Sequence, residues 1–396
     1  MREGMNQYRP YGAALLLISL AMGCAAQQGS GRPARPAAEP GDRASAAATA
    51  APQHSGHRAS RGFTLAASGD VIASYPSVLE TARQDAGGGG YDYRPILAGV
   101  KPVIEGADLA ICHLETPFGP DGGPFTGYPA FKAPPQVADA LKATGYDSCS
   151  TASNHTLDDG AEGVRRTLDR LDRAGIKHTG SARDAAEARR PALLKAPGGA
   201  RVAQLSYTYG TNGVPQPQGK PWTVGVIDAG KVVADARAAR RAGADVVVVS
   251  PHWGTEYQTE PDEQQLKVAK ALTESKTGGR PDIDLVVGTH AHTPQPYEKL
   301  NGTWVVYGMG DQIAGIMERP RGNWGSIARF RFEPPAKDGE RWRVTKAEYI
   351  PQLSAHGPPL RMVNLAATGD RPDVREGIRE AVLSRGAEGA GLTMGR

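Results

Sequence analysis

Apolar runs and helically spaced apolar residues alternate along the chain from Phe63 onward, and this pattern predicts alternating strands and helices. The continuous apolar runs predict strands over residues 63–70, 108–115, 146–151, 202–207, 244–250 and 284–288. Apolar residues three or four positions apart predict helices over residues 93–105, 136–142, 160–174, 229–242 and 261–273.

The later part of the chain has a different pattern. Asn301-Gly302 separates two short apolar segments and predicts a tight hairpin. Further strands are expected over 327–332 and 342–350, and past Asn364 we expect a loosely held helix and tail. Strands alternating with helices and then hairpins indicate an α/β fold with a mixed sheet or two packed sheets.

Metal-ligand residue types directly follow the apolar runs at five strand ends. They are Asp70, Glu115, Asn154 with His155, His252, and His290 with His292. Each has a simpler explanation when taken alone, as a turn cap, a solvated carboxylate or a packed histidine. Because parallel strands bring their carboxyl ends to one edge of a sheet, we expect these side chains to meet. Carboxylate, amide and imidazole together suit two divalent ions of the Mn, Zn or Fe class.

The ordered motifs at these strand ends resemble the CapA family of capsule or poly-γ-glutamate biosynthesis proteins. The motifs are Gly69-Asp70, His113-Leu114-Glu115, Ser153-Asn154-His155, His252-Trp253-Gly254 and Gly288-Thr289-His290-Ala291-His292. The resemblance covers residues 63–360 and implies a calcineurin-like metallophosphatase fold, a four-layer α/β/β/α sandwich. We place this domain at residues 62–362 and the C-terminal helix and tail at 363–396.

The resemblance also implies roles for the ligand residues. Asp70 and His292 would hold one ion, while a second set would hold the other, with Glu115 bridging the two. That second set is Asn154, His252 and His290. An extended backbone at His290 and His292 would turn their rings toward different ions. His155 would stabilise the phosphoryl oxygens or protonate the leaving group.

Three nearby residues have open roles. His113 stands where the family commonly has Asn, and it is either a partner of the ligands or a buried polar residue. Asp311, in Gly310-Asp311-Gln312, also departs from the family pattern and either adds negative charge or forms a turn. Trp253 either lines the pocket or packs in the core.

The N-terminal region resembles a bacterial export signal. Arg2 and Arg9 precede a short apolar run that ends in Leu20-Ala21-Met22-Gly23-Cys24. This predicts a signal peptide with a lipobox over 1–24 and lipidation of Cys24, the alternative being ordinary cleavage near Ala25-Ala26. Residues 25–61 are poor in large apolar side chains and are expected to form a disordered tether. We therefore expect an extracytoplasmic protein anchored to a bacterial cell membrane.

Charge argues against nucleic-acid binding, and the positions of two cysteines predict their chemical state. The net charge of +4 resides in the N-terminal 61 residues, so the folded part has no electrostatic footprint for nucleic acid. Cys112 and Cys149 lie in apolar strand segments, where we expect buried free thiols.

Two functions remain open. The first is a dimetal hydrolase that acts on phosphoester bonds of an anionic substrate. The second is a non-catalytic accessory that binds an anionic polymer or membrane subunits of a capsule or polyglutamate synthase. The full set of metal ligands favours the hydrolase, and the family's role in polymer synthesis favours the accessory.

Overall fold

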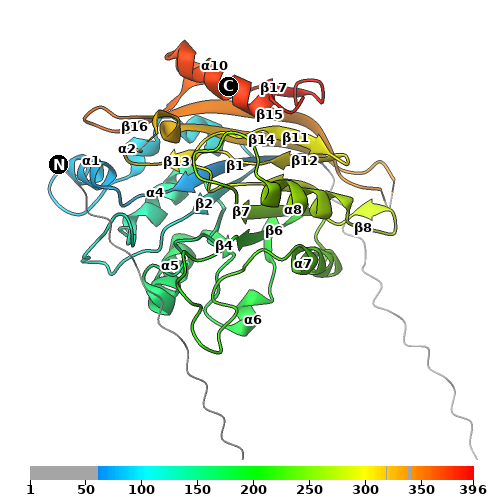
Figure 1. The fold of residues 1–396 in the computed structure, drawn as a ribbon, viewed down its shortest axis with the longest axis horizontal. Helices are drawn as coiled ribbons and strands as arrows, with labels where there is room; N and C mark the ends of the chain where they lie inside the picture. The colour runs from blue at the N-terminus through cyan, green and yellow to red at the C-terminus, as the bar shows by residue number, and fades with distance from the viewer. Residues whose placement is uncertain (1–60, 318, 338–339) are drawn as a thin grey trace, which may run out of the picture. The chain divides into compact units, whose positions relative to one another are not determined.

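The computed structural model describes residues 61–317, 319–337 and 340–396, which lie in one unit that extends from Gly56 to Arg396 (Figure 1). The predicted signal peptide, Cys24 and the tether up to residue 60 lie outside the described residues. Among the residues described, no helix is both long enough and apolar enough to cross a bilayer.

The first of two large sheets is mixed. Its main strand order is β16 (Arg361–Asn364), β15 (Arg343–Ala355), β14 (Trp324–Glu333), β1 (Phe63–Val71), β2 (Leu109–Leu114), β3 (Ser148–Ser150) and β4 (Lys177–Thr179). Two short strands join it, β13 (Asp311–Ile313) parallel to β1 and β17 (Leu392–Met394) parallel to β15. Strands β1 to β4 run parallel, so their carboxyl ends share one edge.

The second sheet is also mostly parallel. Its order is β11 (Tyr297–Leu300), β12 (Thr303–Val306), β10 (Leu285–Val287), β7 (Val246–His252), β6 (Arg201–Thr208) and β5 (Ala192–Lys195). Strands β6, β7, β10 and β12 are parallel, while β5 and β11 run antiparallel at the two margins. A small separate hairpin pairs β8 (Lys276–Thr277) with β9 (Arg280–Pro281).

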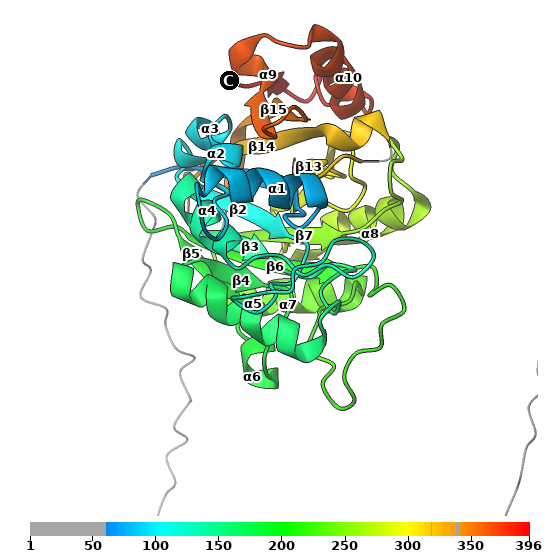
Figure 2. The same cartoon turned by 90° about the vertical axis from the view of Figure 1, so that its left-hand side faces the viewer.

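Helices cover the outer face of each sheet. The first sheet carries α1 (Pro76–Asp85), α2 (Arg94–Leu97), α3 (Lys101–Glu105), α4 (Gln136–Thr144) and α5 (Gly160–Ala174). The second carries α7 (Ala229–Arg241) and α8 (Glu263–Glu274). The remaining helical segments are α6 (Ala185–Ala188), η1 (Pro320–Asn323), α9 (Leu365–Thr368) and α10 (Pro372–Leu383). In Figure 2, α1, α2 and α4 lie together next to β2.

Alternating side chains along the central strands separate the hydrophobic clusters. Leu65 of β1 and Val248 of β7 pack in the cluster between the two sheets. Their neighbours point the other way, Ala66 toward the helices of the first sheet and Val247 toward α7 and α8. Both sheets are therefore buried on both faces, as mostly parallel sheets require. The resulting layer order confirms the expected α/β/β/α sandwich.

Three expectations were wrong. The helix predicted over 93–105 is two short helices, because Pro102 lacks the N–H that a continuous helix needs. The expected loose tail instead packs firmly: α10 buries Val374, Ile378 and Val382, and β17 pairs with β15 (Figure 1, red). The apolar positions of α10 are periodic, but its many Arg and Glu residues mask the pattern.

The third correction concerns the cysteines. Cys112 of β2 and Cys149 of β3 occupy directly paired positions on adjacent parallel strands, with Cα atoms 4.5 Å apart. They form a disulfide, where two free thiols were expected. Strand register decides this pairing, and the order of residues in the sequence does not reveal it.

Candidate metal centre

Strand ends from both sheets converge at one place. Asp70 near the end of β1 and His113 in β2 belong to the first sheet, while His252 ends β7 of the second. His113 Nε2 and His252 Nδ1 each lie 3.7 Å from Asp70 Oδ1. Glu115 follows β2 directly and is buried. All four lie at carboxyl ends of parallel strands, the edge at which α/β sheets bind ligands.

The segment after β10 carries His290 and His292 in a curled conformation. Their φ angles are 95° and 50°, in the left-handed region that non-glycine residues rarely adopt. The His290 N–H donates to Asp70 Oδ2 at 3.0 Å, which ties this segment to the opposite sheet. The expectation of an extended backbone here was wrong. Strained backbone of this kind is concentrated at functional sites.

His292 is held by carboxylates on both sides of its ring. Its Nδ1 is 2.9 Å from Asp311 Oδ1 and 3.6 Å from Asp70 Oδ2, and its Nε2 is 3.8 Å from Glu115 Oε1. The Asp311 carboxylate accepts the Nδ1 proton and so directs Nε2 toward Glu115. A carboxylate that orients a histidine in this way is a common support for a metal ligand. Asp311 therefore lies inside the site, where the sequence left its role open.

Asn154 connects the segment after β3 to the second sheet. Its Oδ1 is 2.8 Å from His252 Nε2, and its Nδ2 donates to Asn212 Oδ1 at 3.3 Å. On the other side of the His252 ring, Nδ1 is 3.0 Å from Thr289 Oγ1. The structure thus places Asn154 against His252, and the rings of His252 and His290 are 4.7 Å apart.

His155 lies beside this cluster and forms a pair with a carboxylate. Its Nδ1 is 2.7 Å from Asp158 Oδ2, and its ring meets the Phe131 ring edge-on at 4.7 Å. The carboxylate accepts the Nδ1 proton, which leaves Nε2 available to exchange a proton. This arrangement of histidine and aspartate suits general acid or base chemistry.

Unpaired buried polar atoms show that the cluster fits a cation. Five atoms of the cluster are buried with no hydrogen-bond partner: Asp70 Oδ1, His113 Nε2, Glu115 Oε2, His290 Nδ1 and Asp311 Oδ2. Each such atom costs about 1–3 kcal/mol when nothing compensates it. Ligand atoms of Asp70, His113, Glu115 and His252 all lie within 4.8 Å of one another, and two further groups share the remaining histidines. Carboxylates and imidazoles in this number fit divalent ions of the Mn, Zn or Fe class.

Burial shifts the ionisation of the carboxylates upward. It raises the pKa of Asp70 to about 7, with the nearby Asp311 adding to the rise and His292 opposing it. Burial likewise raises the pKa of Glu115 well above its usual range, although His292 lowers it. In the absence of a cation these carboxyl groups therefore take up protons at a higher pH than an exposed carboxyl group does. Metal binding would displace those protons.

The imidazoles divide into two kinds. Burial lowers the pKa of His113 to about 3 and lowers the pKa values of His252 and His290 well below the usual range. Burial also opposes protonation of His292, but Asp311 and Glu115 outweigh it and raise the pKa of His292 well above its usual value. Three rings are thus neutral at neutral pH, the form in which imidazole binds metals.

Sequence reasoning missed two contributors. Glu256, four residues after His252, is exposed and offers a ligand atom near His290 and His292. Ser150 bonds His113 Nδ1 at 2.8 Å. Glu256 could have been found from its closeness to His252 in the sequence. Ser150 could have been suspected from the polar Ser148-Cys149-Ser150 pattern in a strand that is otherwise buried.

Trp253 does not line the site. It is fully buried with the side chains of α7 and α8, and its Nε1 donates to the Tyr307 carbonyl at 2.8 Å. A contact with substrate is therefore excluded for this indole in the described conformation.

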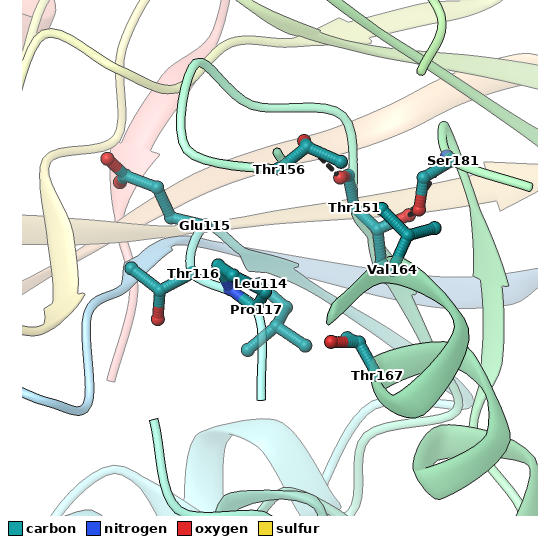
Figure 3. Close-up of a pocket in the computed structure, with 9 residues that line it drawn as sticks. All are labelled: Leu114, Glu115, Thr116, Pro117, Thr151, Thr156, Val164, Thr167 and Ser181. Carbon is teal, nitrogen blue, oxygen red and sulfur yellow. Dashed lines mark hydrogen bonds between the residues drawn. The ribbon is translucent and has the colours of Figure 1, made fainter. Parts of the chain in front are cut away.

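A small cavity of about 10 Å³ lies behind Glu115. Figure 3 shows the residues that line it, with the Glu115 carboxylate extending away from the others. Hydrogen bonds tie Thr151 to Ser181 and to Thr156 across this cavity. The cavity is large enough for about one water molecule and is a packing feature behind the metal cluster.

Parts of this chain are similar to known proteins. A profile described as "Bacterial capsule synthesis protein PGA_cap" matches residues 64–315. "PGA biosynthesis protein CapA" of Bacillus subtilis (strain 168) is 27% identical over 175 residues, covering 44% of this chain and 44% of that protein. "Probable polyglutamine synthesis accessory protein" of Mycobacterium tuberculosis is 32% identical over 219 residues, covering 52% and 55%. The chain spans about half the length of these relatives.

Matches among solved structures include a calcineurin-like phosphoesterase from Bacillus subtilis, with a TM-score of 0.43 and 16% identity over 81% of this chain and 98% of that one. A 5'-nucleotidase precursor from Thermus thermophilus has a TM-score of 0.46 and 15% identity over 80% of this chain and 59% of that one. The profile covers more than half of the sequence, and the chain belongs to the bacterial capsule synthesis protein family.

Proposed function

We propose that this member of the capsule synthesis family is a dimetal hydrolase that cleaves a phosphoester bond during the synthesis of capsule or poly-γ-glutamate. The observation that carries the proposal is a cluster of five unpaired buried polar atoms, which lies where strand ends of the two sheets meet. A structural role alone would leave these atoms uncompensated, whereas divalent ions would take up those of Asp70, Glu115 and His290 as ligands.

The residues divide between two ion positions. Asp70, Glu115 and His292 would hold one ion, and Asn154, His252 and His290 would hold the other, with Glu115 between them. The shared placement of Glu115 is supported by its membership of the Asp70 group and by its 3.8 Å separation from His292. When bound, such ions supply positive charge to the phosphoryl oxygens and activate a nucleophile at neutral pH.

His155 would donate a proton to the leaving group. Asp158 holds the His155 ring at 2.7 Å and fixes Nδ1 as the protonated nitrogen. The ring is mostly buried against Phe131, so its orientation is set before substrate arrives. A fixed imidazole of this kind contributes typically 10²–10⁴-fold to rate.

The test measures metal content and turnover together. The purified protein, loaded with Mn, Zn or Fe, is assayed on a chromogenic phosphomonoester and a phosphodiester. We expect metal-dependent turnover, and we expect Glu115→Gln to lose both metal and activity while the exposed Glu105→Gln keeps both. Absence of turnover in protein that demonstrably holds two ions would refute hydrolysis.

A second function is favoured by the name of one relative, an accessory of polyglutamine synthesis. In that case the metal fold would bind an anionic polymer or membrane subunits of the synthase without cleaving anything. Glu115→Gln would then lose metal and keep its support of polymer production in cells. The same variant therefore separates the two functions.

We also propose that the protein works outside the cytoplasm, held to the cell membrane through lipidated Cys24. The basic and apolar run before Cys24 supports this placement. The disulfide between Cys112 and Cys149 supports it as well, because disulfides persist mainly in oxidising compartments.

A further inference from the structure

His113 is an imidazole inside the metal cluster that the division above leaves without a role. It is 1% exposed, and its ring stacks on the His252 ring at 4.5 Å with an interplanar angle of 18°. Its Nε2 has no hydrogen-bond partner and lies 3.7 Å from Asp70 Oδ1, which has none either. The Nδ1 of this buried ring has Ser150 as its partner, and Nε2 needs a partner as well.

The partner of the other ring nitrogen decides which nitrogen carries the proton. Ser150 Oγ donates its single hydrogen to the Cys112 carbonyl at 3.2 Å. The same oxygen is 2.8 Å from His113 Nδ1 and therefore accepts the proton of that nitrogen. His113 Nε2 is left with a bare lone pair directed toward Asp70.

Two buried hydrogen-bond acceptors, His113 Nε2 and Asp70 Oδ1, then face each other. His113 Nε2 and the ionised Asp70 Oδ1 each have a lone pair, lie 3.7 Å apart and have no hydrogen-bond partner. Placing a proton on either atom does not help, because 3.7 Å is too long for a hydrogen bond. A cation between the two atoms removes the conflict, and Asp70, His113, Glu115 and His252 each offer one ligand atom within 4.8 Å of the others.

We propose that His113, through Nε2, is an additional ligand of an ion that Asp70 also holds, and that Ser150 is the residue that positions its ring. This rests on the proposed metal centre. It adds a fourth imidazole to the three of His252, His290 and His292. A larger share of nitrogen ligands selects ions of the Zn and Fe class over Mg and Ca, which prefer oxygen.

The experiment titrates metal into the chelator-stripped full chain and follows cobalt by its visible absorption and zinc by calorimetry. Wild type is expected to take up about two equivalents. His113→Asn should weaken one of the two by more than about 100-fold and change the cobalt spectrum, because a nitrogen ligand is lost. His178→Asn is the matched control, since His178 pairs with Asp172 away from the cluster.

Ser150 variants separate positioning from folding. Ser150→Ala should weaken the same ion by about 10–100-fold while the saturated protein keeps both ions, and Ser150→Thr, which retains the hydroxyl, should restore the affinity. These variants also decide the matter if His113→Asn fails to fold, as judged by circular dichroism.

The two ways in which the proposal can fail are distinguishable. Wild-type affinity and an unchanged cobalt spectrum in both His113→Asn and Ser150→Ala would overturn the role of His113 and leave the dimetal centre standing. A wild-type chain that binds no ion would overturn the centre itself, and His113 with it.

Discussion

Replacing Asp70 by Asn should stabilise the metal-free protein while abolishing metal binding. Burial raises the pKa of Asp70 from 3.8 to about 7. At about 1.4 kcal/mol per pKa unit, this rise corresponds to about 4 kcal/mol of unfavourable free energy for holding the ionised carboxylate in the folded state. Asn keeps an oxygen to accept the His290 N–H and puts an amide N–H toward His113.

The stability difference between Asp70→Asn and wild type should depend on pH in a definite direction. The unfolded carboxyl ionises near 3.8 and the folded one near 7, so the folded protein holds the extra proton between these values. Stability contributed by this group is therefore complete below pH 3.8 and is lost as the pH rises through about 7. The advantage of Asp70→Asn over wild type should accordingly be near zero at low pH and greatest above about pH 7.

The assay is urea unfolding in the presence of a chelator, at several pH values between about 4 and 8. Comparing the variant with wild type at each pH cancels the contributions of His113, His252 and His290, which are common to both. Asp121→Asn, at an exposed aspartate, is the matched control and should change little. An Asp70→Asn protein no more stable than wild type at about pH 8, or an advantage independent of pH, would refute the reasoning. With metal added, only wild type should gain stability.

Three further changes test other parts of the structure. Asp311→Asn should lower the affinity for one ion by about 10–100-fold, because the carboxylate orients His292, and an unchanged titration would contradict this. Gly288→Ala should cost at least about 2 kcal/mol in urea unfolding, since its Cβ would overlap the backbone carbonyl of Tyr307, directly after β12, whereas Gly357→Ala, in open space, should be nearly neutral. Cys24→Ser should move the protein from the membrane fraction to the soluble fraction, and retention on membranes would argue against a lipid anchor.

Local patterns were sufficient for much of the fold. The helix over 160–174 was predicted with the observed bounds, because Val164, Leu168 and Leu171 mark one face and Gly175 ends it in the left-handed conformation. The bounds predicted for the strands between residues 63 and 288 agree with the observed ones to within two residues, since a polar residue or glycine stands at or just after the end of each apolar run. The ligand types at these ends could therefore be named before their distances were known.

Features set by strand register and loop conformation were not predictable in the same way. Asp311 lies opposite Asp70 because β13 pairs with β1 in parallel, a relation between residues far apart in the chain. The disulfide depends on the pairing of β2 with β3. The left-handed φ angles of His290 and His292 occur in a segment that the His290 N–H joins to Asp70, a long-range contact that local propensity cannot indicate.

The bond between His290 and Asp70 joins residues that are 220 positions apart in the chain. Closing a loop of that length costs about 5 kcal/mol in chain entropy, so this contact forms late, after both sheets have assembled. Neither half of the ligand set can hold an ion with its full coordination before that moment. On the proposed metal centre, the protein would therefore acquire its ions as a finished fold, and the ions available where folding ends would decide which of them it binds.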